Sequence, residues 1–116
     1  MCRTVQLILL ITCVAVCGCQ SSSTTLLGRP LPVQSPLLVD HLKPSRLPVV
    51  IEGTMVEKCP VAGCWFKVED KSGIVKVDTK NAGFVVVSVP TGTKVRVAGT
   101  YQGDPEPLIT ATGMTY

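Results

Sequence analysis

The sequence predicts an all-β protein in which residues 49–116 form a small, curved antiparallel barrel of five or six strands. Three observations lead to this fold class. Short runs within this range alternate apolar and polar residues and are rich in valine, as half-buried strands are. Tight-turn residues separate the runs, and no run shows the apolar period of a convincing helix. The full length of 116 residues leaves room for one such domain.

The first 18 residues have the order of an export signal. Arg3 supplies an early positive charge, an apolar run follows from Val5 to Val16, and small residues come next. A membrane-spanning helix needs about 20 apolar residues, and this run is shorter. We therefore expect residues 1–18 to be removed as a signal peptide.

The sequence Val16-Cys17-Gly18-Cys19 resembles the lipobox of bacterial lipoproteins, in which a small residue precedes the cysteine that is lipidated. The resemblance implies that Cys19 carries the acyl chains and is a stable membrane anchor. Gln20, rather than an Asp, follows this cysteine, which implies an outer-membrane anchor facing the periplasm. An ordinary secretory signal is the alternative.

Residues 19–48 are rich in Ser and Pro and show no sustained periodicity, so they predict a lipid-anchored, loosely held tether. Within it, Ser35 resembles a helix N-cap, and Pro44 would end a helix of two turns. His41, the one histidine of the chain, lies on this short helix, where a solvated surface role is expected.

The first three strands are expected in close succession. The run 49–59 is rich in β-branched residues, and Gly53 is a position for a bulge. The run 64–70 alternates apolar and polar residues, and the tight-turn residues 70–73 follow it. The run 74–78 should therefore return as its hairpin partner. On this alternation, Phe66 faces the core and Trp65 faces outward.

Two further runs complete the barrel. The run 91–104 places Val95 and Val97 on one face, and the run 107–116 closes the chain. Between the third and fourth strands, residues 81–90 contain a cluster of valines, which favours extended structure over helix.

The combined pattern resembles the OB-fold, a small Greek-key barrel. The resemblance rests on a glycine in the first strand, a Val-x-Val-x-Gly run at 95–99, and a Cys-x4-Cys-Trp motif at 59–65 that enters the second strand. OB-type domains in bacterial exported proteins share this pattern, which covers residues 49–116. One departure is that OB-folds usually place a helix where residues 81–90 lie. An SH3-like barrel is the alternative fold.

Cys59 and Cys64 are the two cysteines left once the signal is removed and Cys19 is lipidated. In an oxidising compartment this pair is expected to form a disulfide that closes a short loop. The spacing differs from the Cys-x2-Cys of dithiol redox catalysts, which argues against that role. The alternative is a copper or zinc site in which Cys59, Cys64 and His41 are candidate ligands.

The outward-facing Trp65 is the leading candidate for ligand contact, together with the cations Lys67, Lys76 and Arg96. Proteins that bind single-stranded nucleic acid use such an arrangement of an aromatic ring beside cations. However, the chain has 11 Lys plus Arg against 8 Asp plus Glu, so it has no strongly basic field and we expect no nucleic-acid partner. Packing of Trp65 beneath the tether or beneath the segment around Phe84 is the structural alternative.

No enzyme signature is present in the barrel sequence. It has no histidine for a general base, no nucleophile elbow, no paired carboxylate motif and no phosphate loop. The sequence therefore predicts a non-catalytic binding or interaction module without a cofactor, held at a membrane by its lipid anchor. The expected partner is an envelope protein or glycan. A metal-handling protein that uses Cys59 and Cys64 is the alternative function.

Overall fold

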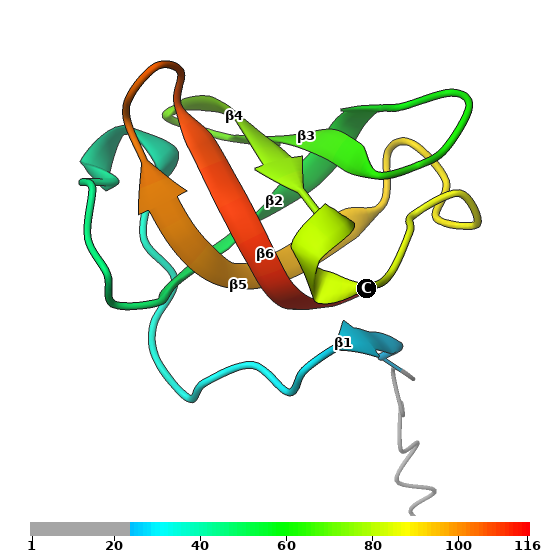
Figure 1. The fold of residues 1–116 in the computed structure, drawn as a ribbon, viewed down its shortest axis with the longest axis horizontal. Coiled ribbons are helices and arrows are strands. Elements are labelled where there is room, and N and C mark those ends of the chain that lie inside the picture. The colour runs from blue at the N-terminus through cyan, green and yellow to red at the C-terminus, as the bar shows by residue number, and fades with distance from the viewer. Residues whose placement is uncertain (1–23) are drawn as a thin grey trace, which may run out of the picture.

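The computed structural model describes residues 24–116, whose strands close into a barrel (Figure 1). The strand order is β6-β4-β3-β2-β5, and the pairing of β5 with β6 closes the barrel. β4 and β6 pair in parallel, and the other neighbours are antiparallel. The five barrel strands are β2 (Val49–Lys58), β3 (Trp65–Asp70), β4 (Gly73–Asp78), β5 (Lys94–Gln102) and β6 (Leu108–Thr115). The predicted all-β barrel is confirmed, whereas the predicted signal peptide and Cys19 lie outside the described residues.

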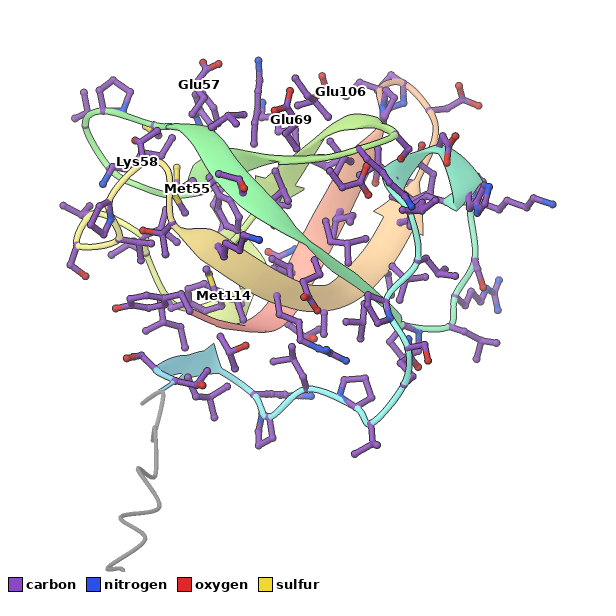
Figure 2. All side chains as sticks on the ribbon, turned by 180° about the vertical axis from the view of Figure 1, so that it is seen from behind. Met55, Glu57, Lys58, Glu69, Glu106 and Met114 are labelled. Atoms are coloured by element: carbon purple, nitrogen blue, oxygen red, sulfur yellow. The ribbon has the colours of Figure 1, made fainter. Side chains whose placement is uncertain are left out.

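The barrel interior is filled by the side chains that alternate inward along the strands. Phe66 and Val68 of β3 are fully buried, as their alternation predicts. Met55 and Met114, labelled in Figure 2, are also fully buried and join the same core from β2 and β6. Burial of this apolar surface is the main favourable contribution to folding.

Gly53 has a role other than the predicted bulge. The register of β2 against β3 shifts between Met55 and Glu57, so the irregularity lies around Val56. A Cβ atom on Gly53 would overlap the backbone carbonyl oxygen of Glu69. Glycine is therefore needed here because β3 approaches β2 closely.

The segment between β4 and β5 is neither a long helix nor a strand. It begins with the short 3-10 helix η2 (Lys80–Ala82) and continues through turns. Val86 and Val89 are fully buried in the core. The Nζ atom of Lys58 donates hydrogen bonds to the carbonyl oxygens of Val87 at 2.8 Å and Val89 at 2.6 Å. The valines that predicted extended structure therefore cover one end of the barrel.

The region predicted as a loose tether is docked on the barrel from Thr25 onward. β1 (Leu26–Gly28) pairs with the last residues of β6, and it is the sixth strand of the sheet. β4 pairs with only the first part of β6, so the remaining edge of β6 has free backbone groups that β1 satisfies. The structure therefore differs from the prediction, because Ser and Pro content does not reveal an open sheet edge.

We call residues 29–48, which run from β1 to β2, the strap. The backbone N–H of Leu37 donates to the carbonyl of Val50 at 2.8 Å. Val50 points away from the core because its neighbours Val49 and Ile51 are core residues, yet Val50 is fully buried. The strap thus covers an apolar position on the outer face of β2.

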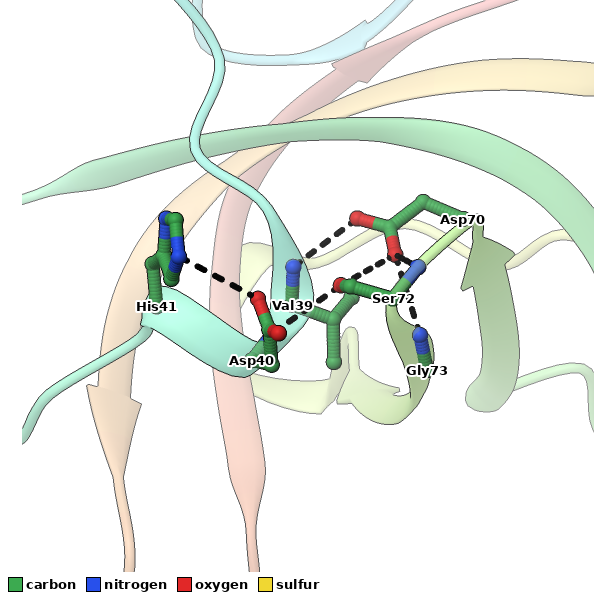
Figure 3. Close-up of polar contacts among 6 residues, drawn as sticks. All are labelled: Val39, Asp40, His41, Asp70, Ser72 and Gly73. Atoms are coloured by element: carbon green, nitrogen blue, oxygen red, sulfur yellow. Dashed lines mark hydrogen bonds and ion pairs between the residues drawn. The ribbon is translucent and has the colours of Figure 1, made fainter.

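The strap includes a short 3-10 helix, η1 (Val39–His41), in place of the predicted helix of two turns. Figure 3 shows how η1 is held by the turn between β3 and β4. The N–H of Val39 donates to Asp70 Oδ2 at 2.8 Å, and the N–H of Asp40 donates to Ser72 Oγ at 3.1 Å. Leu42, the residue after η1, is buried in the core. Within residues 24–116, no helix has the length and apolar character needed to cross a membrane.

Candidate functional site

Trp65 lies on the outer surface of the barrel, where β3 and β4 run side by side. Its position alternates with that of Phe66, whose side chain is fully buried, and the Trp65 side chain is half-buried. The Nζ atom of Lys76 lies 5.1 Å from the centroid of the Trp65 ring. This geometry is a cation–π contact, so the predicted proximity of Trp65 and Lys76 is confirmed.

Lys67 belongs to the same face because it lies directly opposite Lys76 in the antiparallel pair of β3 and β4. Like charges at directly opposite positions destabilise a sheet. Each lysine has an acidic neighbour: Lys67 Nζ is 3.4 Å from Glu57 Oε2, and Lys76 Nζ is 4.0 Å from Glu106 Oε1. We call the surface formed by Trp65, Lys67 and Lys76 the tryptophan face.

Sequence reasoning missed both acidic neighbours of the tryptophan face. Glu57 is placed beside Lys67 by the register of β2 against β3. Glu106 comes from the loop 103–107 between β5 and β6, a segment distant in sequence from β4. No local pattern indicates that this loop reaches Lys76, since the contact depends on the closure of the barrel.

Arg96 does not lie on the tryptophan face. It is on β5, which is separated from β3 by β2 in the strand order. Its Nη1 atom is 3.1 Å from Glu52 Oε2, and its Nη2 atom donates to the carbonyl oxygen of Gln34 at 2.7 Å. Arg96 therefore holds the strap, and the structure does not bring it together with the other candidate ligand-binding residues.

The loop that joins β2 to β3 carries both candidate cysteines. Cys59 and Cys64 are free and half-buried in this structure. The N–H of Cys59 donates to the carbonyl of Trp65 at 3.0 Å, and the N–H of Thr79 donates to the carbonyl of Cys64 at 2.9 Å. The loop thus adjoins the tryptophan face through the backbone. The predicted disulfide is not present in this structure and stays a prediction for the oxidised protein.

The local backbone favours the thiolate form of Cys59. Hydrogen bonds from the backbone N–H of Ala62, followed by those of Val61 and Gly63, lower the pKa of the Cys59 thiol to about 7. The left-handed conformation of Gly63, at φ 61°, suits the tight turn of this loop. Cys59 is therefore a candidate for thiol chemistry.

The third candidate metal ligand is far from the cysteine pair. His41 is on η1, which packs against the turn after β3, whereas Cys64 immediately precedes the first residue of β3. The Nε2 atom of His41 is 3.6 Å from Asp40 Oδ1. Within residues 24–116, no group of three or more His, Cys, Asp or Glu side chains is arranged to hold a metal ion. Apart from His41, the sequence candidates leave only the two cysteines, whereas a structural zinc site needs four ligands.

A groove of about 470 Å³ lies between the strap, the middle of β2 and the end of β3. Two of its three acidic side chains have partners within the protein: Glu52 binds Arg96, and Asp70 binds the turn and η1. The groove is formed by the docking of the strap. The tryptophan face has an aromatic ring, so we place the candidate ligand contact there.

No protein-family model matches this chain, and no curated protein sequence matches it. A solved structure does: the chain is similar in fold to the structure of the hypothetical protein ygiW from E. coli. The match has a TM-score of 0.53 and 18% sequence identity, and covers 72% of this chain and 90% of that chain. The chain folds as an OB-type barrel. At this level of identity the similarity establishes the fold and assigns no function.

The tryptophan face can be placed within the OB-type architecture. OB-folds bind ligands on the surface of the second and third barrel strands, between the loop joining strands one and two and the loop joining strands four and five. In this chain those strands are β3 and β4, and the two loops are residues 59–64 and 103–107. The tryptophan face therefore lies on the second and third barrel strands, between these two loops.

Proposed function

We propose that this protein is a lipid-anchored protein of the bacterial envelope whose OB-type barrel is a non-catalytic binding module. The observation that carries the proposal is the position of Trp65, whose ring lies beneath Lys76 on the surface that OB-folds use for ligands. The anchor is the acylated Cys19 implied by the lipobox, most consistent with an outer-membrane location facing the periplasm.

The residues of the tryptophan face favour binding over catalysis. Trp65 offers an apolar ring surface, while Lys67 and Lys76 offer hydrogen-bond donors at its border. Opposed lysines reduce the stability of a sheet, and local conflicts of this kind are expected at functional sites. The ligand class that fits is an envelope protein or glycan, because such ligands use apolar stacking together with polar contacts.

A nucleic-acid ligand fits this surface less well. Glu57 and Glu106 lie beside the two lysines at 3.4 and 4.0 Å, and their carboxylates would repel a phosphate backbone. The chain carries a formal net charge of +3, which is small for a protein that binds polyanions.

Photocrosslinking in cells tests the binding module. A benzophenone amino acid at position 65 should yield a discrete crosslinked product in envelope preparations, and Lys76→Glu should weaken that product because it removes the cation above the ring. The matched control is the same amino acid at Val33, an exposed apolar position on the strap. Identical products from positions 65 and 33 would contradict the proposal.

Metabolic labelling tests the anchor separately. Cells that express the full chain in the presence of labelled palmitate should incorporate label into the wild-type protein and not into Cys19→Ser. Substituting Cys17 by serine is the matched control, because this residue also lies in the lipobox but is expected to leave with the signal. Equal labelling of the wild type and Cys19→Ser would contradict lipidation.

A further inference from the structure

We propose that the barrel rests directly on the phospholipid surface that carries its anchor, with an apolar edge formed by Leu26, Val85 and Val87 against the lipid. This inference relies on the proposed lipidation of Cys19. It goes beyond anchoring, because it assigns a membrane-contacting surface and an orientation to the folded domain.

Only a short stretch of chain separates Cys19 from the folded domain. Thr25 and Tyr116 exchange two backbone hydrogen bonds, of 2.7 and 3.0 Å, so the domain holds the chain from this point onward. From Cys19 to Thr24 the chain has five Cα–Cα steps (24 − 19 = 5), which span at most about 18 Å. The domain therefore cannot move far from the lipid to which Cys19 is attached.

An apolar surface lies near this point. The ring of Phe84 lies against Gly28 of β1, since a Cβ atom on Gly28 would be 2.8 Å from Phe84 Cε1. The chain then continues through Val85 and Val87, which are 52% and 55% exposed on either side of the buried Val86. Leu26 of β1 is 45% exposed. Phe84 thus packs against β1 and leads into Val85, while Val87 lies farther along, against Gly63 of the loop 59–64.

The distribution of charge also bears on this orientation. In Figure 2, Glu57, Glu69 and Glu106 lie along the upper edge of the barrel, whereas β1 lies at the lower edge. Arg29 follows β1 directly and lines a shallow groove together with residues of η2, where Lys80 is exposed. The carboxylates of Glu57 and Glu106 are paired with Lys67 and Lys76 at that upper edge. Arg29 and Lys80 place cations near β1, where they can contact anionic headgroups such as phosphatidylglycerol.

The two surfaces then have separate roles. β1 and the segment 84–88 face the membrane, while Glu57 and Glu106 mark the edge of the tryptophan face and lie away from β1 (Figure 2). A barrel that lies on the lipid in this way leaves Trp65 open to a partner in the adjacent compartment.

Quenching of tryptophan fluorescence by brominated lipid tests this inference. The chain has one tryptophan, so Trp65→Phe removes the background signal. Val87→Trp and, independently, Leu26→Trp are then introduced into the full-length lipidated protein. Each protein is reconstituted in vesicles of phosphatidylethanolamine and phosphatidylglycerol with brominated acyl chains. Quenching at positions 87 and 26 should exceed that of the control by about twofold or more, because their side chains lie in the interfacial region.

The matched control is Ile74→Trp, since Ile74 is 52% exposed and lies in β4 next to the turn that binds η1. Quenching at position 74 equal to that at positions 87 and 26 overturns the inference. A blue-shifted but unquenched signal at 87 also overturns it, because protein rather than lipid would then cover the edge. The intact mass of each preparation separates the two proposals: acylated protein without selective quenching overturns this inference alone, whereas absence of acyl mass overturns both.

Discussion

Asp70 is the residue that links the strap to the barrel. It caps the turn after β3 by accepting hydrogen bonds from the N–H groups of Ser72 at 2.7 Å and Gly73 at 3.1 Å. Its second oxygen accepts from Val39 of η1. Partial burial alone would raise the pKa of Asp70, but the hydrogen bonds, led by that of the Ser72 hydroxyl, outweigh burial and lower it.

Asp70→Asn should therefore destabilise the protein at neutral pH by about 1–2 kcal/mol, because an amide cannot accept all of these bonds. A carboxylate with a lowered pKa contributes stability that is present above its unfolded pKa, about 3.9, and is lost as the pH falls through the folded value. The difference between wild type and variant should thus stay constant down to about pH 5 and shrink below about pH 4. Urea unfolding of the wild type and the variant across this pH range measures the difference in their free energies of unfolding.

The matched control for this experiment is Asp104→Asn, since Asp104 is exposed in the loop between β5 and β6. It should change stability little at any pH. A pH profile of Asp70→Asn that resembles that of the control would contradict the role given to Asp70.

Cys59 offers a second test at the residue scale. In the reduced protein with Cys64→Ser, the rate of alkylation by iodoacetamide should rise with pH around a midpoint of about 7, since backbone N–H groups stabilise the thiolate. The same chain in denaturant is the control, and its midpoint should move to about 8.5. A midpoint that is the same in the folded and denatured chains would show that the loop does not activate this thiol.

At the scale of elements, β1 depends on the glycine it faces. Gly28 is opposite Gly113 in the pairing of β1 with β6. A Cβ atom on Gly113 would overlap the backbone carbonyl oxygen of Arg29. The strand and the start of the strap thus approach β6 more closely than any side chain at this position allows.

Gly113→Ala should displace β1 and the start of the strap while leaving the barrel folded. The expected loss of stability is about 1–3 kcal/mol, as for other overpacked positions. Amide exchange should accelerate at Thr25 and Arg29, whose N–H groups bond to β6 or the residue after it, and stay slow in β2 and β3. Gly73→Ala is the control because its added Cβ would meet Val39 Cγ1 at an ordinary 3.5 Å. Unchanged exchange at Thr25 in Gly113→Ala would contradict this account.

At the scale of the whole molecule, the folded unit is larger than the barrel. β1 completes the edge of β6, the strap covers Val50, and Leu42 enters the core. Residues 24–48 therefore contribute backbone hydrogen bonds and buried apolar surface, which a mobile tether would not.

A protein that begins at Val49 should thus be less stable than one that begins at Thr24. Loss of the buried Leu42 side chain alone is expected to cost about 2–3 kcal/mol. The exposed edge of β6 should also promote association between chains. Urea unfolding and sedimentation of the two proteins measure both effects. Equal unfolding midpoints would indicate that the strap adds nothing to stability.

The candidate site was predicted in part. The alternation of β3 and the tight turn at 70–73 suffice to place Trp65 outward and Lys76 on the neighbouring strand, because both are local features. Arg96 was assigned to the same surface on alternation alone. Alternation predicts whether a side chain points inward or outward, but it does not predict where around a closed barrel the strand lies. Its contacts with Glu52 and Gln34 depend on pairings across more than 40 residues.

The sequence by itself determined the five barrel strands, their inward and outward faces, and the start of β2 at Val49, because strand periodicity and turn residues act over a few neighbouring positions. The tertiary structure alone decided which strand edges remain open, where the Ser- and Pro-rich segment docks, and that Glu106 reaches Lys76. These features depend on backbone groups and side chains that meet only after the barrel has closed. No local sequence pattern predicts these contacts, since the free energy that stabilises them comes from parts of the chain that are distant in sequence.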